Sequence, residues 1–128
     1  MRVLVDTHIL LWAIYRPERI SSVMQARLRD RANAVYFSAI SIAEIAIKSS
    51  LGRADFSFAP DEVSRAARDS AFDELPLTAA HASRLVSLAW HHRDPFDRFL
   101  VAQAIEESVR LMTADSVLLA YSDLVELV

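Results

Sequence analysis

The sequence RVLVDTHILLWAIY, at residues 2–15, contains a strand, one acidic residue and a helix in immediate succession. Arg2–Val5 is a short apolar run of the kind that forms a buried parallel strand. Thr7–Tyr15 is apolar and helix-prone, and it stops where Arg16-Pro17 disfavours further helix. Asp6 stands between the two elements, where aspartate is a favoured helix N-cap. The stretch predicts a strand–helix unit with a carboxylate at its junction.

Strands and helices alternate along the rest of the chain. We expect further strands at 35–38, 72–77, 110–113 and 124–127, and further helices at 21–31, 41–51, 61–70, 79–90, 94–108 and 116–121. This alternation predicts an α/β fold in which helices cover both faces of a mainly parallel sheet of four to five strands. In such sheets ligands bind beyond the carboxyl ends of the strands, so polar residues that follow strands are the first candidates for a site.

The length of 128 residues suits one domain spanning 1–128, and we see no repeat, low-complexity segment or linker. The absence of cysteine excludes disulfides, thiolate catalysis and cysteine zinc sites. The longest uncharged stretch, Ala32–Ala43, is far short of the roughly 20 residues that span a bilayer. The apolar run before Asp6 is also shorter than a signal peptide requires. We therefore expect a cytoplasmic protein with no membrane partner.

The formal net charge of -3 provides no basic footprint for nucleic acid over the whole chain. This balance argues against broad electrostatic affinity for RNA, but a metal cluster can bind phosphate where carboxylates alone would repel it. More than half of the residues are apolar, which indicates that some apolar surface is buried against a partner.

Three acidic residues fall at strand ends or helix starts. Asp6 ends the first strand, Asp115 follows the fourth strand after Thr113, and Asp97 lies in the first turn of the helix opened by Asp94-Pro95. Each has an ordinary structural explanation, because aspartate caps helices and favours their positive N-terminal end. Asp94 is interpreted mainly as such a cap, and the Thr113 hydroxyl is placed to orient Asp115.

A fourth acid, Glu44, lies inside a helix. At about 100° per residue, Ser41, Glu44 and Lys48 fall on one narrow stripe, while apolar residues cover most of the remaining circumference. A helix that is apolar nearly all round is largely buried, so the stripe is expected to face a cleft. The structural alternative is an ordinary Glu44–Lys48 ion pair one turn apart.

Several carboxylates in one cleft repel one another and raise each other's pKa. A hard divalent cation such as Mg²⁺ or Mn²⁺ resolves that conflict, because it prefers oxygen ligands. Such an ion can activate water and neutralise charge on a scissile phosphate. Asp6, Glu44, Asp97 and Asp115 together therefore favour phosphodiester hydrolysis.

Four segments resemble the motifs of PIN domains, and in particular those of toxins from bacterial VapBC toxin–antitoxin pairs. The segments are Val3–His8, Ser41–Lys48, His92–Ala104 and Leu111–Asp115, in the family's order and spacing. The third, His-Arg-Asp-Pro-Phe-Asp-Arg-Phe-Leu-Val-Ala-Gln-Ala, is the most specific. The resemblance covers essentially the whole chain, and no core acid is missing.

The resemblance implies a three-layer α/β/α sandwich and an endoribonuclease that depends on Mg²⁺ or Mn²⁺. It implies that Asp6, Glu44, Asp97 and Asp115 form the catalytic and metal-binding cluster, with Thr7 and Thr113 as supporting polar groups. It also implies a homodimer that is inhibited by a small VapB-like antitoxin, whose tail lies across the cleft.

Other polar residues carry weaker hypotheses. Arg98 and Lys48 are candidates for contact with the substrate phosphate, although each could instead pair with a neighbouring carboxylate. The four histidines lack the spacing of a helical zinc site, and His92 is interpreted mainly as a helix-end residue that could touch RNA.

Two other functions stay open. The first is a non-catalytic interaction module that keeps the acids for structure only. The second is another Mg²⁺-dependent phosphoesterase, such as a haloacid-dehalogenase-like phosphatase. The second is disfavoured because His8 stands where that chemistry usually has a second aspartate after the first strand.

Overall fold

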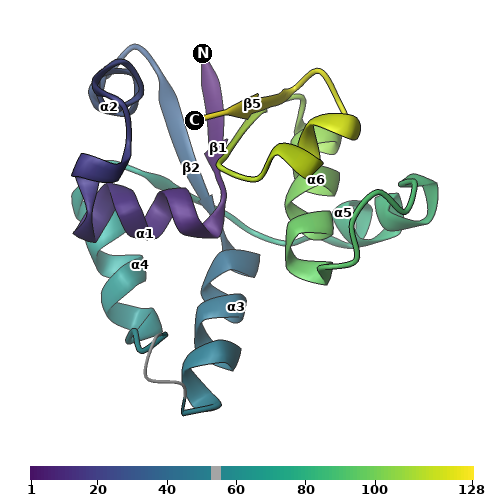
Figure 1. Cartoon of the computed structure of the whole chain (residues 1–128), viewed down its shortest axis with the longest axis horizontal. Coiled ribbons are helices and arrows are strands. Elements are labelled where there is room, and N and C mark those ends of the chain that lie inside the picture. Colours follow the sequence, from purple (N-terminus) through teal and green to yellow (C-terminus); the bar gives the residue numbers. More distant parts are fainter. Residues whose placement is uncertain (53–55) are drawn as a thin grey trace.

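The computed structural model describes residues 1–52 and 56–128, and within them a five-stranded sheet is covered by helices on both faces (Figure 1). The sheet order is β3-β2-β1-β4-β5, and each neighbouring pair is parallel. The prediction of an α/β sandwich around four to five parallel strands is therefore confirmed. The strands are β1 (Arg2–Val5), β2 (Ala34–Ser38), β3 (Asp73–Leu75), β4 (Arg110–Thr113) and β5 (Val125–Leu127).

Helices join these strands as the sequence pattern predicts. They are α1 (Thr7–Tyr15), α2 (Ser22–Arg29), α3 (Ala39–Ser50), α4 (Pro60–Asp69), α5 (Ala79–Arg84) and α6 (Pro95–Glu107), with short 3₁₀ turns η1 (Pro17–Arg19), η2 (Leu85–Ser87) and η3 (Ser116–Ala120). None of the helices in the described ranges has the length and apolar character needed to cross a bilayer.

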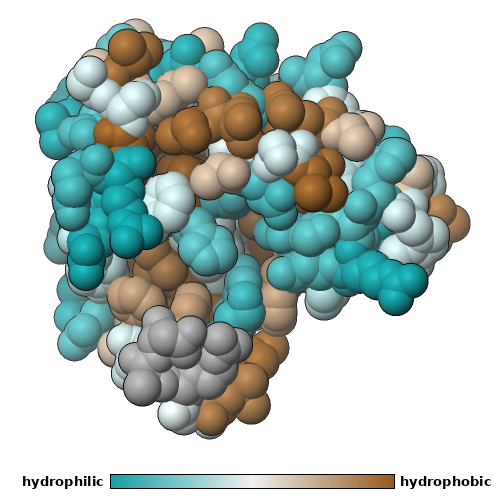
Figure 2. All heavy atoms as spheres, in the orientation of Figure 1, coloured by the Kyte–Doolittle hydropathy of each residue, from teal (hydrophilic) through white to brown (hydrophobic). Residues whose placement is uncertain are grey.

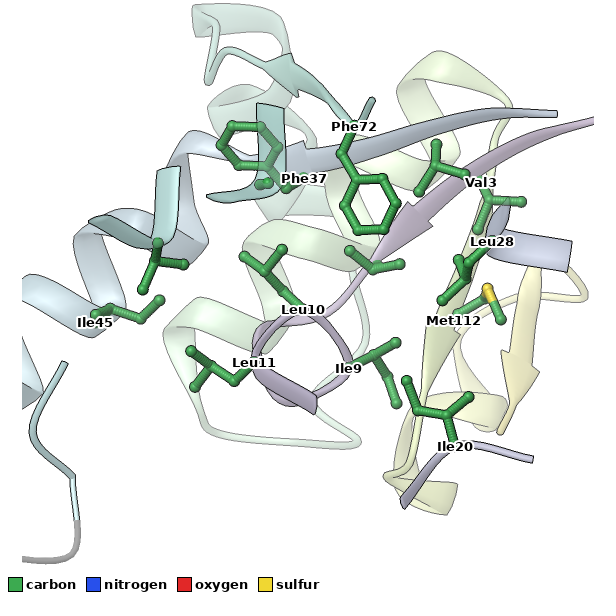
Figure 3. Close-up of a cluster of buried hydrophobic side chains, with 14 residues drawn as sticks. Val3, Ile9, Leu10, Leu11, Ile20, Leu28, Phe37, Ile45, Phe72 and Met112 are labelled. Carbon is green, nitrogen blue, oxygen red and sulfur yellow. The ribbon is translucent and has the colours of Figure 1, made fainter. Parts of the chain in front are cut away.

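Alternate residues of each strand point to opposite faces of the sheet and so build two separate cores. On one face, residues of β1 and β4 such as Val3 and Met112 pack with α1, α2 and α4. Figure 3 shows Ile9, Leu10 and Leu11 of α1 among the side chains of this cluster. On the other face, Leu4 and Leu111 pack against α6 and the segment after β3. The two cores fix α1 and α6 on opposite sides of the sheet.

The helix predicted at 79–90 is much shorter in the structure. The α-helix ends at Arg84, a 3₁₀ turn follows, and Trp90 lies in a loop with 77 % of its surface exposed. The cause is Arg98 of α6, whose guanidinium lies within hydrogen-bond distance of the carbonyl oxygens of Leu85, Leu88 and Ala89. These contacts stabilise the non-helical path of the chain after the 3₁₀ turn.

Helix α3 also departs from expectation on its outer side. It begins at Ala39, capped by the Ser38 hydroxyl, and it was expected to be apolar and buried nearly all round. Ile47 is instead half exposed, and Leu51 just beyond the helix is 68 % exposed. Figure 2 shows hydrophobic residues at this tip of the molecule and in a band over η3 and β5. The helix buries only the side that faces α1, α4 and α6.

Candidate metal centre

Asp6 occupies the junction between β1 and α1 and is almost completely buried, with 4 % of its surface exposed. Its Oδ1 accepts a hydrogen bond from the backbone N–H of Ile9 at 2.8 Å, which makes it the predicted N-cap of α1. Its Oδ2 accepts from the Thr113 hydroxyl at the end of β4. Burial raises the pKa of this carboxyl, and the two hydrogen bonds oppose that shift.

Glu44 reaches the same region from α3 and is equally buried, at 3 % exposed. Its Oε1 accepts from the Thr7 hydroxyl at 2.7 Å, and its Oε2 forms an ion pair with Lys48. Thr7 Oγ1 lies 2.9 Å from Ser41 Oγ, which ties the start of α1 to α3. The Glu44–Lys48 ion pair is present, and Ser41 and Glu44 are also buried. Both interpretations of this stripe therefore hold together.

Asp97 projects from the first turn of α6, which Asp94 caps by accepting from the backbone N–H of Phe96 at 2.9 Å. Asp97 Oδ2 lies 2.9 Å from His92 Nε2, and because a carboxylate can only accept, the histidine donates. Burial raises the pKa of Asp97 to about 6, and the negative charges of Asp94, Asp6 and Glu44 add to the effect. Acids from three different elements therefore act on one carboxyl group.

Asp115 follows β4 and is the most open of the four acids, with 38 % of its side chain exposed. Its Oδ1 caps η3 by accepting from the backbone N–H of Val117 at 3.0 Å. Its Oδ2 lies 3.7 Å from His92 Nε2, on the side that also contacts Asp97. Thr113 links this acid to Asp6, because its hydroxyl donates to Asp6 and accepts from the backbone N–H of Asp115.

The parallel register explains why these residues meet. Val5 pairs with Met112, so the residues that follow them, Asp6 and Thr113, lie side by side at the carboxyl edge of the sheet. Helices α3 and α6 lie beside each other below this edge (Figure 1) and bring Glu44 and Asp97 to it. Asp6, Glu44 and Asp97 are thus close enough to interact electrostatically beyond the strand ends, where ligands bind in open α/β sheets.

The donor set suits a divalent metal ion. Ligand atoms of His92, Asp94 and Asp97 all lie within 4.8 Å of one another. Burial, together with the nearby charges of Asp94, Asp6 and Glu44, raises the pKa of Asp97, and a bound cation would favour its charged form. Carboxylate oxygens are the ligands that Mg²⁺ and Mn²⁺ prefer, and of the four predicted acids only Asp97 belongs to the group with His92 and Asp94.

His92 and Tyr121 adjoin this centre; the sequence suggested His92 only as a helix-end residue that could touch RNA, and it gave no role to Tyr121. Tyr121 Oη accepts from the backbone N–H of His92 at 2.9 Å and from Arg98 Nη1 at 2.9 Å. The place of His92 two residues before Asp94 was a usable signal. Tyr121 gave none, because its contact with His92 spans 29 residues of chain.

Arg98 is buried away from any substrate phosphate, contrary to one of the hypotheses from the sequence. Only 4 % of its surface is exposed, and Nη1 donates to the carbonyl of Ala89 at 2.7 Å. The guanidinium also lies 4.0 Å from the centre of the Trp90 ring. Its donors are directed to the backbone of the loop that carries His92, so its role in the structure is to hold that loop.

Comparison with known proteins identifies the family. The family model of the PIN domain matches residues 3–124. The chain belongs to the PIN domain family. PIN domains are generally nucleases, and nucleases of this family generally depend on divalent metal ions. No curated protein matches the chain in sequence.

Solved structures share the fold of this PIN domain at low sequence identity. A chain of VapBC2 from Rickettsia felis, bound to a DNA fragment from its promoter, superposes with a TM-score of 0.73 at 18% identity, covering 99% of this chain and 98% of that one. VapBC-5 from Mycobacterium tuberculosis superposes with a TM-score of 0.62 at 17% identity, covering 99% of this chain and 97% of that one. VapBC-1 from nontypeable Haemophilus influenzae superposes with a TM-score of 0.59 at 18% identity, covering 90% of this chain and 87% of that one. At these identities the likeness is one of fold.

The raised pKa of Asp97 predicts a pH dependence of stability. A carboxyl group whose pKa is higher in the folded than in the unfolded chain stabilises the fold when it is protonated. The metal-free PIN domain should therefore gain stability as the pH falls from about 7.5 to about 5. Added Mn²⁺ should raise Tm more at the upper pH, where the carboxylate is free to bind the ion. Thermal melts of the wild-type domain and Asp97→Asn measure both effects.

Asp97→Asn is the control for the other titrating groups, since it should lose the pH-dependent gain and most of the shift caused by Mn²⁺. Identical pH profiles for the two proteins would contradict the raised pKa of Asp97.

Arg98→Leu should destabilise the PIN domain by about 2–3 kcal/mol, because it leaves buried carbonyls without their charged donor. Arg98→Lys should recover only part of this loss, since an ammonium group cannot reproduce the planar fork. Urea unfolding measures both, with the exposed Arg65→Leu as a control expected to lie within about 0.5 kcal/mol of wild type. A fully stable Arg98→Leu variant would contradict the role assigned to this residue.

Proposed function

We propose that this PIN domain is an endoribonuclease that uses Mg²⁺ or Mn²⁺, and that it is the toxin of a bacterial type II toxin–antitoxin system. The observation that carries the proposal is the placement of Asp6, Glu44 and Asp97 around the carboxyl edge of the sheet, where burial first and then the charges of Asp94, Asp6 and Glu44 raise the pKa of Asp97 to about 6. Acidic groups that perturb one another in this way at a sheet edge are typical of metal-assisted phosphodiester hydrolysis.

The proposed ligands and catalytic acids are Asp6, Glu44, Asp97 and Asp115. A metal ion bound there supplies an activated water and neutralises charge on the scissile phosphate. Three of the carboxylates arrive already oriented by the chain. Asp6 is fixed by Ile9 and Thr113, Glu44 by Thr7 and Lys48, and Asp97 by His92. Such fixed orientation lowers the cost of assembling the reactive geometry.

Supporting roles follow from the contacts of each residue. We propose that Thr7, Ser41 and Thr113 orient the acids through their hydroxyls, and that His92 holds Asp97 through its Nε2–H, with Asp115 Oδ2 3.7 Å from the same nitrogen. Asp94 contributes mainly as the cap of α6. Lys48 compensates the charge of Glu44 with which it is paired, so its proposed contact with substrate phosphate requires that pair to open.

We further propose that residues 1–128 form one domain that acts in the cytoplasm, as a homodimer inhibited by a VapB-like antitoxin. Two features support a protein partner. The fold is shared with chains of VapBC structures, and Ile47 and Leu51 leave an apolar tip on α3. Exposed apolar clusters of this kind commonly mark interfaces between proteins.

Cleavage assays with Asp97→Asn test the proposed chemistry. The wild-type domain should cleave single-stranded RNA in Mg²⁺ or Mn²⁺ and lose this activity in EDTA. Asp97→Asn should lower kcat/KM by at least about 100-fold, because loss of a ligand exceeds the usual effect of a supporting residue. The exposed acid Asp123→Asn provides a matched control with unchanged activity.

Three results would overturn this function. Turnover of a phosphate monoester with none of RNA would indicate another phosphoesterase. Calorimetric titration with Mn²⁺ that gives the same binding for wild type, Asp6→Asn and Asp97→Asn would favour a non-catalytic module. Full RNA cleavage by Asp97→Asn would show that the third acid is misassigned.

Asp94→Ala and Asp94→Ser separate capping from chemistry. Asp94→Ala should lower the free energy of unfolding by about 1 kcal/mol, whereas serine can still accept from Phe96 and should restore most of it. Both variants should retain most of the cleavage activity if Asp94 acts as a cap. Loss of activity in both, with the melting temperature of Asp94→Ser unchanged, would place this carboxylate among the ligands.

A further inference from the structure

We propose that the loop between α5 and α6 forms a stacking slot for an unpaired base of single-stranded RNA, with Trp90 as the stacking side chain. The inference rests on the proposed nuclease function, because it assigns the means by which that site takes hold of its substrate. Figure 1 shows the segment after α5 projecting beyond the body of the sheet. Nothing in the metal centre itself requires an exposed tryptophan there.

The indole of Trp90 is both exposed and held in place. It is 77 % exposed, although tryptophan is highly buried on average. The Arg98 guanidinium lies over the ring at 4.0 Å from its centre. That guanidinium is itself immobilised by the Ala89 carbonyl and the Tyr121 hydroxyl. A rigid aromatic surface loses little entropy on binding, which is the property a stacking platform needs.

A cleft beside the ring has the chemistry of a nucleotide site. It has a volume of about 340 Å³ and is lined by Leu85, Val86, Trp90, Arg93, Pro95 and Arg98. This size lies at the lower end of the range for ligand pockets and admits one flat heteroaromatic ring. Val86 and Trp90 offer apolar surface, and Arg93 offers an exposed cation that can meet a phosphate. The combination suits a base with its attached backbone.

The cleft lies close to the acidic centre. Trp90 precedes His92 by two residues, and two residues of chain span at most about 7 Å. His92 Nε2 in turn lies 2.9 Å from Asp97 Oδ2. Arg98, which lines the cleft and lies over Trp90, shares the Tyr121 hydroxyl with the backbone N–H of His92. A base held against Trp90 is therefore close to the loop whose His92 contacts Asp97.

Single-stranded RNA fits this surface better than duplex. Stacking on a side chain requires a base that is not already stacked in a helix. The net charge of -3 also gives little general attraction for a duplex backbone, so local stacking and Arg93 must supply much of the affinity.

Fluorescence of Trp90 provides a test that does not depend on cleavage. The chain has two tryptophans, so Trp12→Phe leaves Trp90 as the only indole. Titration with a single-stranded RNA hexamer in EDTA should quench this fluorescence saturably, whereas a hexamer of abasic nucleotides should not. Trp90→Leu should weaken hexamer binding by about 5- to 150-fold, and Trp90→Phe should retain most of the affinity. The exposed aromatic Tyr15→Leu is the matched control and should bind like wild type.

The failure of this inference is distinguishable from failure of the nuclease function. RNA cleavage in Mn²⁺ with equal kcat/KM for wild type and Trp90→Leu, and no quenching, would overturn the slot alone. Quenching with bases but no cleavage by the wild-type domain would overturn the nuclease and leave the slot supported. A change in Trp90 fluorescence on dilution of the protein alone, without any response to RNA, would show that a second copy covers the cleft and would overturn the proposal.

Discussion

Burial of neighbouring carboxylates at the carboxyl edge of the sheet is the constraint on which the site of this PIN domain depends. The strand register places Asp6 against Thr113, and α3 and α6 bring Glu44 and Asp97 to the same edge. Held together in partial isolation from water, these groups raise the pKa of Asp97. Hydrogen bonds to Asp6, Glu44 and Asp97 partly offset the cost of burying these carboxylates.

The aspartates at this edge combine helix capping with a place in the acidic site. Asp6 and Asp115 each cap a helix through Oδ1, and each directs Oδ2 toward the site, to Thr113 and His92 respectively. A helix N-terminus favours negative charge, so capping partly offsets the repulsion within the cluster. Structural and functional explanations of these residues are therefore compatible, because the two oxygens of one carboxylate serve different partners.

Arg98 joins the acidic centre to the loop beside it. Its guanidinium binds the carbonyl of Ala89, shares the Tyr121 hydroxyl with the backbone of His92, and lies over Trp90. One buried cation thus fixes both the histidine that contacts Asp97 and the exposed indole next to it. The sequence suggested Arg98 as a candidate for contact with the substrate phosphate. In the structure its guanidinium instead stabilises the loop that we propose binds the RNA base.

The sequence by itself determined the order of strands and helices, the caps at Asp6 and Asp94, and the presence of acids after the strands. These features depend on periodicity and on contacts within a few residues, which any segment carries locally. Only the tertiary structure decided that α5 ends at Arg84, that Arg98 is buried, and that Tyr121 joins His92. Each of these outcomes arises from a side chain that meets groups distant in sequence, and such contacts exist only after the chain has packed.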